Sequence, residues 1–435
     1  MRKGLVGSIL ALAAAAGMAN AQPPGPGPGP MVNPLMGGDP FGGAGIPPGP
    51  AGALFGQPGA DPLGPGPNAE AGYLQFDALL STFRTMKSNY PLITVGTTTV
   101  GGTHPNLGTT SLFGAENFNF NPFMGGRFNH GMWFQRNPEW GFEWGGFVTE
   151  QRQEQFVLGV GDQVLARPFI NADSGLPDSF VIAFPGFARG GVTSTLNSQL
   201  WGLEWNLQRK LFTDATKSFT FNFGLRYLDL EEDLSVASQT FFLPGAHTFF
   251  YGTEFGPPTL IPTPNRVDVQ DSFGTRNQYI VAQFGMSGEW RYNRWVVQWC
   301  TKLGLGDVRQ TLDITGSSSI QLTAGAAFDE VPGGVLAVSS NIGRYHSDQF
   351  VVIPEGRIQV GYRFFSNVDL VVGYNFMFMS RAARPADQID PTINTANIPT
   401  GEFYSFPAGP GRPLAAINQT DIWMQSLNFG FSIHY

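Results

Sequence analysis

Charged residues are scarce in this 435-residue sequence, because Asp, Glu, Lys and Arg together make up only 13% of it. An ordinary soluble domain carries about 25%. Long apolar runs are missing too: after the first 21 residues, nothing approaches the roughly 18 to 20 apolar residues that a spanning helix needs. The single Cys300 excludes an intrachain disulfide framework and a multi-cysteine zinc site. With 33 acidic and 25 basic residues, the net charge of −8 argues against a nucleic-acid-binding protein.

Aromatic residues, by contrast, are plentiful at 13% of the chain. Disordered chains are poor in aromatics, so disorder throughout is excluded. Low charge, many aromatic residues and no long apolar run favour one class of protein above the others. This is the membrane β-barrel, in which apolar residues are spread by alternation along the strands.

Residues 1–21 have the pattern of a secretory signal peptide. Arg2 and Lys3 provide the positive end, and the apolar run Leu5 to Met18 follows. Ala19-Asn20-Ala21 places small residues at the two positions that a signal peptidase reads, so we expect cleavage before Gln22. The alternative is an uncleaved signal anchor. In either case the sequence predicts export.

Residues 22–69 are of low complexity. Pro and Gly account for 28 of these 48 residues, in no strict collagen repeat, and there is no Lys or Arg. Proline removes backbone donors and glycine raises the entropic cost of ordering, so we expect a disordered, solvated linker. A contact with the cell wall is the alternative function for this tract. The barrel itself is predicted over residues 70–435.

From Tyr73 onward, apolar and polar residues alternate with period two in ten segments. In one of them Phe221, Phe223 and Leu225 share a face, while small or polar residues occupy the other. The apolar faces are nearly free of charge, as a lipid-facing surface must be. The ten segments begin near Tyr73, Gly125, Trp140, Val192, Phe219, Ile280, Trp295, Arg357, Asp369 and Ser426.

The connections between these segments are alternately short and long. The long ones cover about residues 84–124, 150–191, 235–272, 316–346 and 381–420. This pattern predicts an all-β fold: a transmembrane antiparallel up-and-down β-barrel of about ten strands, with short periplasmic turns and long outer loops. Residues 113–123 or 151–159 would raise the count to twelve. Several segments exceed the 9 to 11 residues that a tilted spanning strand needs, so we expect strands that project above the membrane.

Parity places nine charged side chains on the inner face of the predicted barrel. In a wet channel they would tune ion selectivity, whereas in a narrow barrel they would pair across the lumen and fill it. The sequence leaves both outcomes open. The predicted lumen-lining residues are Arg127, Glu143, Glu204, Arg226, Glu289, Lys302, Arg357, Arg363 and Asp369.

Three other features have a plain and a functional interpretation. Cys300 faces inward by parity and reads as a small lumen residue. His130 falls on the apolar face, which indicates either a position at the membrane interface or a β-bulge. The acidic run 229–233 suggests a cation or lipid-headgroup contact, but a solvated loop margin is the plainer interpretation. None of the five histidines has a metal-ligand spacing, so we predict no enzyme, no metal site and no cofactor.

Several longer motifs resemble a known family. They include Ala166-Arg167-Pro168-Phe169, Gly224 to Leu230, Gly333 to Ala337, Ser340 to Tyr345, Phe350 to Glu355, Gly373 to Phe378, Arg384 to Asp390, and Thr420 to Gly430. Over about residues 71–435 the chain resembles porin-like outer-membrane β-barrel proteins of planctomycete-type bacteria. The resemblance implies an outer-membrane barrel, and it brings no substrate and no catalytic residues.

The last predicted strand has the form of an assembly signal. Alternating apolar residues that end in an aromatic are read by the barrel-assembly machinery in many outer-membrane proteins, and Phe429, Phe431, Ile433 and Tyr435 fit that form. The predicted function is passive passage of ions or small solutes through a porin-like channel in the bacterial outer membrane, surrounded by its lipid. The alternative is a closed structural or adhesive barrel that presents its long loops. The oligomeric state is left open.

Overall fold

The computed structural model describes most of the chain from residue 71 to residue 435. The gaps are residues 107, 115–117, 119–121, 161, 247, 251–258, 262, 264, 322–328 and 406–410. The predicted signal peptide (1–21) and Gly/Pro-rich linker (22–69) lie outside the described residues. In the described part, no helix combines the length and the apolar character required to cross a membrane.

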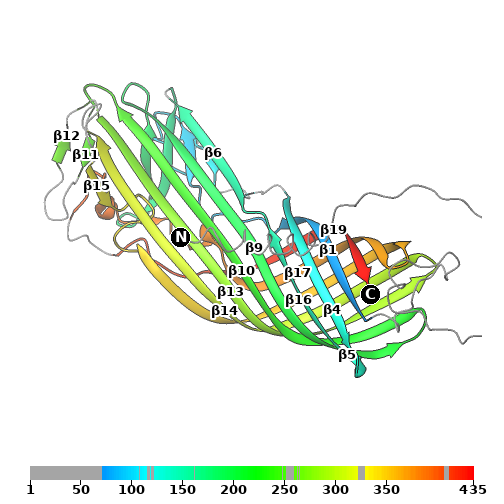
Figure 1. The fold of residues 1–435 in the computed structure, drawn as a ribbon. Helices are drawn as coiled ribbons and strands as arrows, with labels where there is room; N and C mark the ends of the chain where they lie inside the picture. The colour runs from blue at the N-terminus through cyan, green and yellow to red at the C-terminus, as the bar shows by residue number, and fades with distance from the viewer. Residues whose placement is uncertain are drawn as a thin grey trace, which may run out of the picture. The chain divides into compact units, whose positions relative to one another are not determined.

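A closed ring of antiparallel strands forms the wall of the molecule. Each strand pairs with the next around the ring, β1 pairs with β19, and the pairing of β9 with β10 completes the circle. Figure 1 shows the long strands side by side. The ten wall strands are β1 (Gly72–Phe83), β4 (Phe123–Phe134), β5 (Asn137–Thr149), β9 (Ala188–Thr213), β10 (Lys217–Phe242), β13 (Asn265–Tyr292), β14 (Trp295–Gln321), β16 (Gly343–Phe365), β17 (Val368–Ala383) and β19 (Gln419–His434).

The ten predicted segments are thus confirmed as the ten wall strands of an all-β barrel. Among the described residues, neither of the two segments that would have made twelve adds a further strand to the closed ring. The strand β6 (Arg152–Val160) continues the line of β5, because Val148 of β5 faces Trp201 of β9 and Arg152 of β6 faces Ser198 of β9. The other segment, predicted over residues 113–123, begins at Phe113. This residue is the last one of β3 (Thr110–Phe113), a strand of the inner sheet described below.

The outward face of the long strands changes character part of the way along. On β13, Ile280 and Phe284 point outward and are 65% and 42% exposed. Farther along the same face come Gln278, Arg276 and Gln270. The strand has 28 residues, far more than the roughly 9 to 11 that cross a membrane. The strands therefore have a membrane half, with an apolar outer face, and a projecting half, with a polar outer face.

The inward face changes in the opposite sense. In the membrane half it is polar, with Gln283 on β13, and in the projecting half Val269 and Phe273 of β13 are buried. Leu234 and Val236 of β10 are buried beside them in one apolar core. The projecting half is therefore built like a water-soluble protein, while the membrane half has the inverse arrangement.

This inversion explains why the predicted loops were too long. Residues 235–272 and 316–346 contain the ends of β10, β13 and β14, and residues 150–191 contain β6. The alternation continues there, but the apolar residues move to the other face, so the apolar stripe appears to stop. The acidic run 229–233 consequently lies inside β10, and its interpretation as a solvated loop margin was wrong.

Three of the long connections fold inward and share a small inner sheet. Its order is β18-β7-β2-β3, with β8 beside β7. Ile93, Leu165 and Ile182 of this sheet are fully buried against the wall. The strands are β2 (Ile93–Gly96), β3 (Thr110–Phe113), β7 (Val164–Asn171), β8 (Pro177–Ala183) and β18 (Thr392–Ile393).

The remaining elements are short. The strands β11 (Thr248–Phe250) and β12 (Thr259–Ile261) pair with each other, and β15 (Asp329–Pro332) extends the wall beside β14. These three lie at the end of the barrel where the projecting strands terminate (Figure 1). Two 3₁₀ turns, η2 (Pro385–Gln388) and η3 (Thr395–Asn397), belong to the inward-folded connection between β17 and β19.

The inversion predicts that one substitution has different costs in the two halves of β13. Phe284→Arg places a cation on the lipid-facing surface, where it costs about 2–4 kcal/mol of stability at mid-bilayer. Gln270→Arg, at an exposed site on the same face of the same strand, is expected to cost less than about 0.5 kcal/mol. Denaturant titration of each variant folded into lipid vesicles measures the difference. Equal losses would contradict the assigned boundary.

Candidate functional site

Charged side chains meet across the lumen of the membrane half. The ammonium group of Lys302 on β14 lies 2.8 Å from Oε1 of Glu204 on β9 and 3.4 Å from Oε1 of Glu143 on β5. Asn206 also donates to Glu143, at 3.0 Å. Neither β9 nor β5 adjoins β14 in the ring, so these pairs bridge the interior. Three of the predicted lumen residues are thereby brought together.

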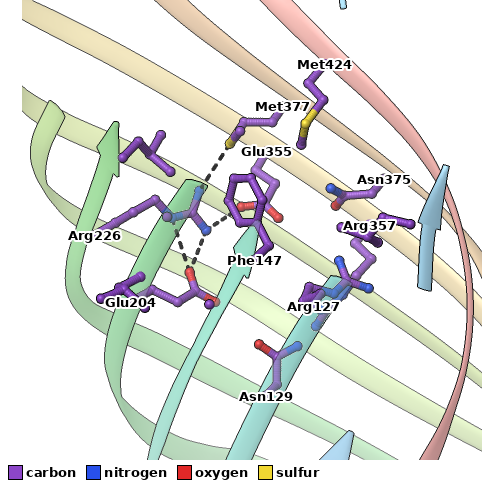
Figure 2. Close-up of a pocket in the computed structure, with 15 residues that line it drawn as sticks. Arg127, Asn129, Phe147, Glu204, Arg226, Glu355, Arg357, Asn375, Met377 and Met424 are labelled. Atoms are coloured by element: carbon purple, nitrogen blue, oxygen red, sulfur yellow. Dashed lines mark hydrogen bonds and ion pairs between the residues drawn. The ribbon is translucent and has the colours of Figure 1, made fainter. Parts of the chain in front are cut away.

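Arg226 extends the same network toward the opposite wall. Its Nη2 lies 2.6 Å from Oε2 of Glu204, and it forms a second ion pair with Glu355 of β16. Its Nη1 lies 3.8 Å from Sδ of Met377 on β17. Figure 2 shows the guanidinium group between these partners. Sequence reasoning missed Glu355, although it shares the parity of Arg357, because the predicted segment began only at Arg357, whereas β16 begins at Gly343.

A further cluster surrounds Arg127, another predicted lumen residue. Its Nη2 and Nε donate to Oδ2 of Asp77 at 2.7 and 2.9 Å. Gln75 also donates to Asp77, at 3.0 Å to each oxygen. Arg357 lies nearby, and when the Asn129 amide is oriented for hydrogen bonding, its oxygen accepts from Nη1 of Arg357 at 3.3 Å. Asp77 was not among the predicted lumen residues, although it lies on the same inner face of β1 as Gln75.

The other predicted lumen residues lie toward the short-turn end. Arg363 Nε lies 2.7 Å from Oδ1 of Asp369, and Nε2 of His434 lies 3.0 Å from Oδ2 of the same carboxylate. Glu289 forms an ion pair with Arg291 and accepts from Gln298 at 2.9 Å. All nine predicted residues therefore lie on the inner face, while their effect on ion selectivity stays a prediction.

The central part of this network balances its charges. Four carboxylates face four cations, and their side chains are mostly buried. Removing one partner of a buried pair leaves an uncompensated charge, at a cost of about 3–5 kcal/mol. The groups therefore hold one another in place. They are Asp77, Glu143, Glu204 and Glu355 with Arg127, Arg226, Lys302 and Arg357.

An apolar layer lies next to the charged network, on the side of the projecting half. Leu228, Val281, Ile353, Met377 and Met424 have relative exposures of 0, 1, 0, 2 and 1% and belong to one packed cluster. They come from β10, β13, β16, β17 and β19, and Val308 of β14 joins them. These six strands are consecutive in the ring. Phe147 of β5 packs against the cluster from the other side of the ring. Inward side chains from seven wall strands thus pack together at this level of the lumen.

Beyond this layer, a buried ion pair anchors the inner sheet to the wall. Arg167 of β7 pairs with Asp271 of β13, and each side chain is 1% exposed. Asp271 also accepts backbone N–H groups of Val335, Leu336 and Ala337, with the first two at 3.1 and 3.0 Å and the third at 2.6 Å. One wall carboxylate therefore holds two separate inward-folded segments.

A second anchor pair joins the connection after β17 to the wall. Arg384 donates to Oε1 and Oε2 of Glu232 on β10 at 2.6 and 2.9 Å, with the two side chains 2 and 0% exposed. Asn277 of β13 adds two hydrogen bonds with the backbone of Ala383, at 2.7 and 2.8 Å. Arg167 and Arg384 lie within two of the motifs that carry the family resemblance.

The acidic run 229–233 is divided between the two faces of β10. Glu232 points inward to Arg384, whereas Asp229 is on the outer face, 2.5 Å from Nη2 of Arg276. Asp233 accepts from Ser272 at 3.0 Å, and burial raises the pKa of its carboxyl group. Within the described parts of the chain, no group of three ligand-type side chains could hold a metal ion.

Small cavities lie in the membrane half. One of about 30 Å³ is lined by Arg127, Asn129, Arg226 and Glu355, among others (Figure 2). A second of about 120 Å³ is lined largely by polar side chains, including Gln208 and Glu289. Since a water molecule needs about 10–15 Å³ of such space, these volumes suit a few waters or a very small solute.

The remaining candidates have clear positions. Cys300 is buried on the inner face and borders the larger cavity. His130 points outward, where its Nε2 lies 2.8 Å from the Tyr435 hydroxyl group and its Nδ1 accepts from Trp144 Nε1 at 2.9 Å. Pairing with β1 is regular at His130, so the structure favours the interface over a bulge.

The predicted assembly signal lies on β19 and just after it. Phe429, Phe431 and Tyr435 are 50, 39 and 56% exposed on the outer surface, and Ile433 shares their parity. Recognition of these residues by the assembly machinery stays a prediction.

Comparison with known proteins gives one family. A family model described as "Putative beta barrel porin-7 (BBP7)" matches residues 73–435. No curated protein matches the chain. Among solved structures, the chain is similar to the outer membrane protease OmpT from Escherichia coli, with 9% identity, coverage of 84% of this chain and 96% of that one, and a TM-score of 0.39. It is also similar to the Pseudomonas putida toluene transporter TodX, with 9% identity, coverage of 84% and 90%, and a TM-score of 0.20.

The anchor pairs predict a localised response to mutation. Asp271→Ala leaves Arg167 without its buried partner and frees three backbone N–H groups, so we expect a loss of about 3–5 kcal/mol. Hydrogen exchange is expected to rise in residues 164–171 and 333–338 but not in the membrane half. Asp268→Ala, on the outer face of the same strand, removes a partly exposed pair with Arg266 and is expected to cost less than about 1 kcal/mol. Equal exchange patterns in the two variants would refute the anchor.

Proposed function

The chain belongs to the beta barrel porin-7 family, and from that premise we propose that this outer-membrane barrel is closed in its folded state. In this proposal it is a structural barrel that holds a folded, polar half outside the membrane. The projecting half then offers a surface for adhesion or for another contact at the cell surface. This is the closed-barrel alternative that the sequence left open.

The observation that supports this proposal is the apolar layer across the lumen. A pore for ions or polar solutes needs a continuous hydrated path, because a charge that loses its water pays a penalty of several kcal/mol. Leu228, Met377 and Met424 are each at most 2% exposed, and the cavity that they help to line is only about 30 Å³, which has room for about two or three water molecules rather than for a hydrated ion. The ion-pair network on one side and the inner sheet on the other add two further packed levels.

A second candidate function is the porin-like channel for ions or small solutes. The family description favours it, as do the polar lumen wall and the cavity of about 120 Å³ in the membrane half. A channel would require the apolar layer and the inner sheet to move apart. The nine predicted lumen residues would then tune selectivity.

Export remains part of the proposal. Cleavage of residues 1–21 before Gln22, contact of residues 22–69 with the cell wall, and reading of the last strand by the assembly machinery are predictions from the sequence. The absence of enzymatic activity is also a prediction. N-terminal sequencing of the protein recovered from outer membranes checks the cleavage site directly.

Conductance in a planar bilayer separates the two candidates. We expect no conductance from the purified, folded protein. Different gel mobility of heated and unheated samples shows that the protein was folded. Discrete, stable steps from the unmodified protein would overturn the closed barrel in favour of the channel.

Variants of the apolar layer test its role in closure. Leu228→Ala, Met377→Ala and Met424→Ala combined remove inward side chains from β10, β17 and β19, so we expect conductance to appear. The control combines Leu225→Ala, Val372→Ala and Leu427→Ala, which removes lipid-facing side chains from the same three strands, and it should stay silent. Silence from both folded variants would show that this layer is not what closes the lumen.

A further inference from the structure

Four exposed cations gather at the short-turn end of the wall. Arg136 lies in the turn between β4 and β5, and Arg294 lies in the turn between β13 and β14. Arg209 is near the end of β9, and Lys217 begins β10. These elements follow one another in the ring, so the cations occupy one side of the rim. We call these four residues the basic rim. Short turns face the periplasm in outer-membrane barrels.

Aromatic side chains of the lipid-facing band accompany the basic rim. The Arg209 guanidinium group lies 5.4 Å from the centre of the Trp140 ring. Lys217 is directly opposite Trp290 in the pairing of β10 with β13. Tryptophan side chains collect at the level of lipid headgroups in membrane proteins. The cations therefore lie where the apolar band meets the headgroups.

The carboxylates of Asp214 and Glu139 offset part of the positive charge at these turns, and four cations against two carboxylates leave a net charge of +2. Asp214 uses its Oδ1 to accept the backbone N–H groups of Thr216 and Lys217 at 2.7 and 2.8 Å, and these hydrogen bonds lower its pKa. Glu289 is paired with Arg291 inside the lumen. Within the described residues, no basic-rim side chain has a carboxylate at ion-pair distance.

The outer boundary of the membrane half has a different arrangement. There Arg276 is paired with Asp229 on the lipid-facing side, and farther out Arg344 is paired with Asp313. Arginines of the projecting half also lie over an aromatic ring, since Arg189 and Arg266 are 5.8 and 5.5 Å from the centre of the Phe241 ring. The two ends therefore differ in their ion pairs: Arg276 and Arg344 have carboxylate partners, whereas the described part of the chain gives the basic rim none.

We propose that the basic rim binds the phosphate groups of anionic phospholipids in the periplasmic leaflet. Attraction of one Lys or Arg to an anionic membrane surface corresponds to about fivefold in affinity. The stacking of Arg209 on a lipid-facing ring places the charge beside lipid rather than toward the interior. This assignment does not depend on whether the lumen conducts.

The test measures which lipids surround the full chain in reconstituted vesicles. Brominated phosphatidylglycerol or brominated phosphatidylcholine is mixed with the unbrominated lipid, and quenching of tryptophan fluorescence reports their relative affinities. We expect a preference for the anionic lipid of about threefold or more, falling to less than about 1.5-fold in 1 M salt, where screening is strong.

A charge-matched pair of variants identifies the residues responsible. Arg136→Gln, Arg209→Gln, Lys217→Gln and Arg294→Gln combined should abolish the preference. The control changes four arginines of the projecting half, Arg189, Arg266, Arg344 and Arg412, to glutamine and should retain it. An unchanged preference in the folded rim variant, or an equal loss in both variants, would overturn the proposal. The proposal would also be overturned if the rim variant kept its lipid preference but lost binding to cell-wall sacculi.

Discussion

The structure depends on one constraint: side chains alternate strictly along each wall strand, while the medium outside changes from lipid to water partway along. On β13, Phe284 faces lipid and Gln283 faces the lumen. More than ten residues away the roles are exchanged, with Phe273 inside and Gln270 outside. A strand cannot shift its parity without a bulge, so the sequence must exchange its apolar and polar positions instead. Most other features of the molecule follow from this exchange of apolar and polar positions.

The exchange also determines what fills the barrel. Where the inner wall is apolar, it must be covered, and the inner sheet covers it with residues such as Leu165 and Ile182. Where the inner wall is polar, its charges are withdrawn from bulk water and need partners, which Lys302 and Arg226 find across the lumen. Only ten strands enclose this space, and side chains can fill a barrel of that size. The packed interior thus follows from the wall and needs no separate plug domain.

Sequence reasoning predicted the membrane half well, because period-two alternation is a local signal. The number of strands, the lipid-facing residues and the inward charges all followed from parity. Projecting strands were expected from the length of the segments, but much of the projecting half was assigned to long loops because the apolar stripe changes face near Asp229. The anchor pairs could not be predicted, because Glu232 and Arg384 are 152 residues apart in the sequence and no local pattern links them. Arg167 and Arg384 were noticed only as parts of family motifs.

The inner sheet has a consequence for how such a barrel could ever open. Its strands come from three different connections: β2 and β3 follow β1, β7 and β8 follow β6, and β18 follows β17. Each connection is tied to the wall at both ends, and β7 is hydrogen-bonded to strands of the other two. No single segment can therefore withdraw while its neighbours stay in place. Clearing the lumen would require the inner sheet to unfold cooperatively. The free-energy cost would be that of unfolding a small protein core rather than that of moving a hinged gate.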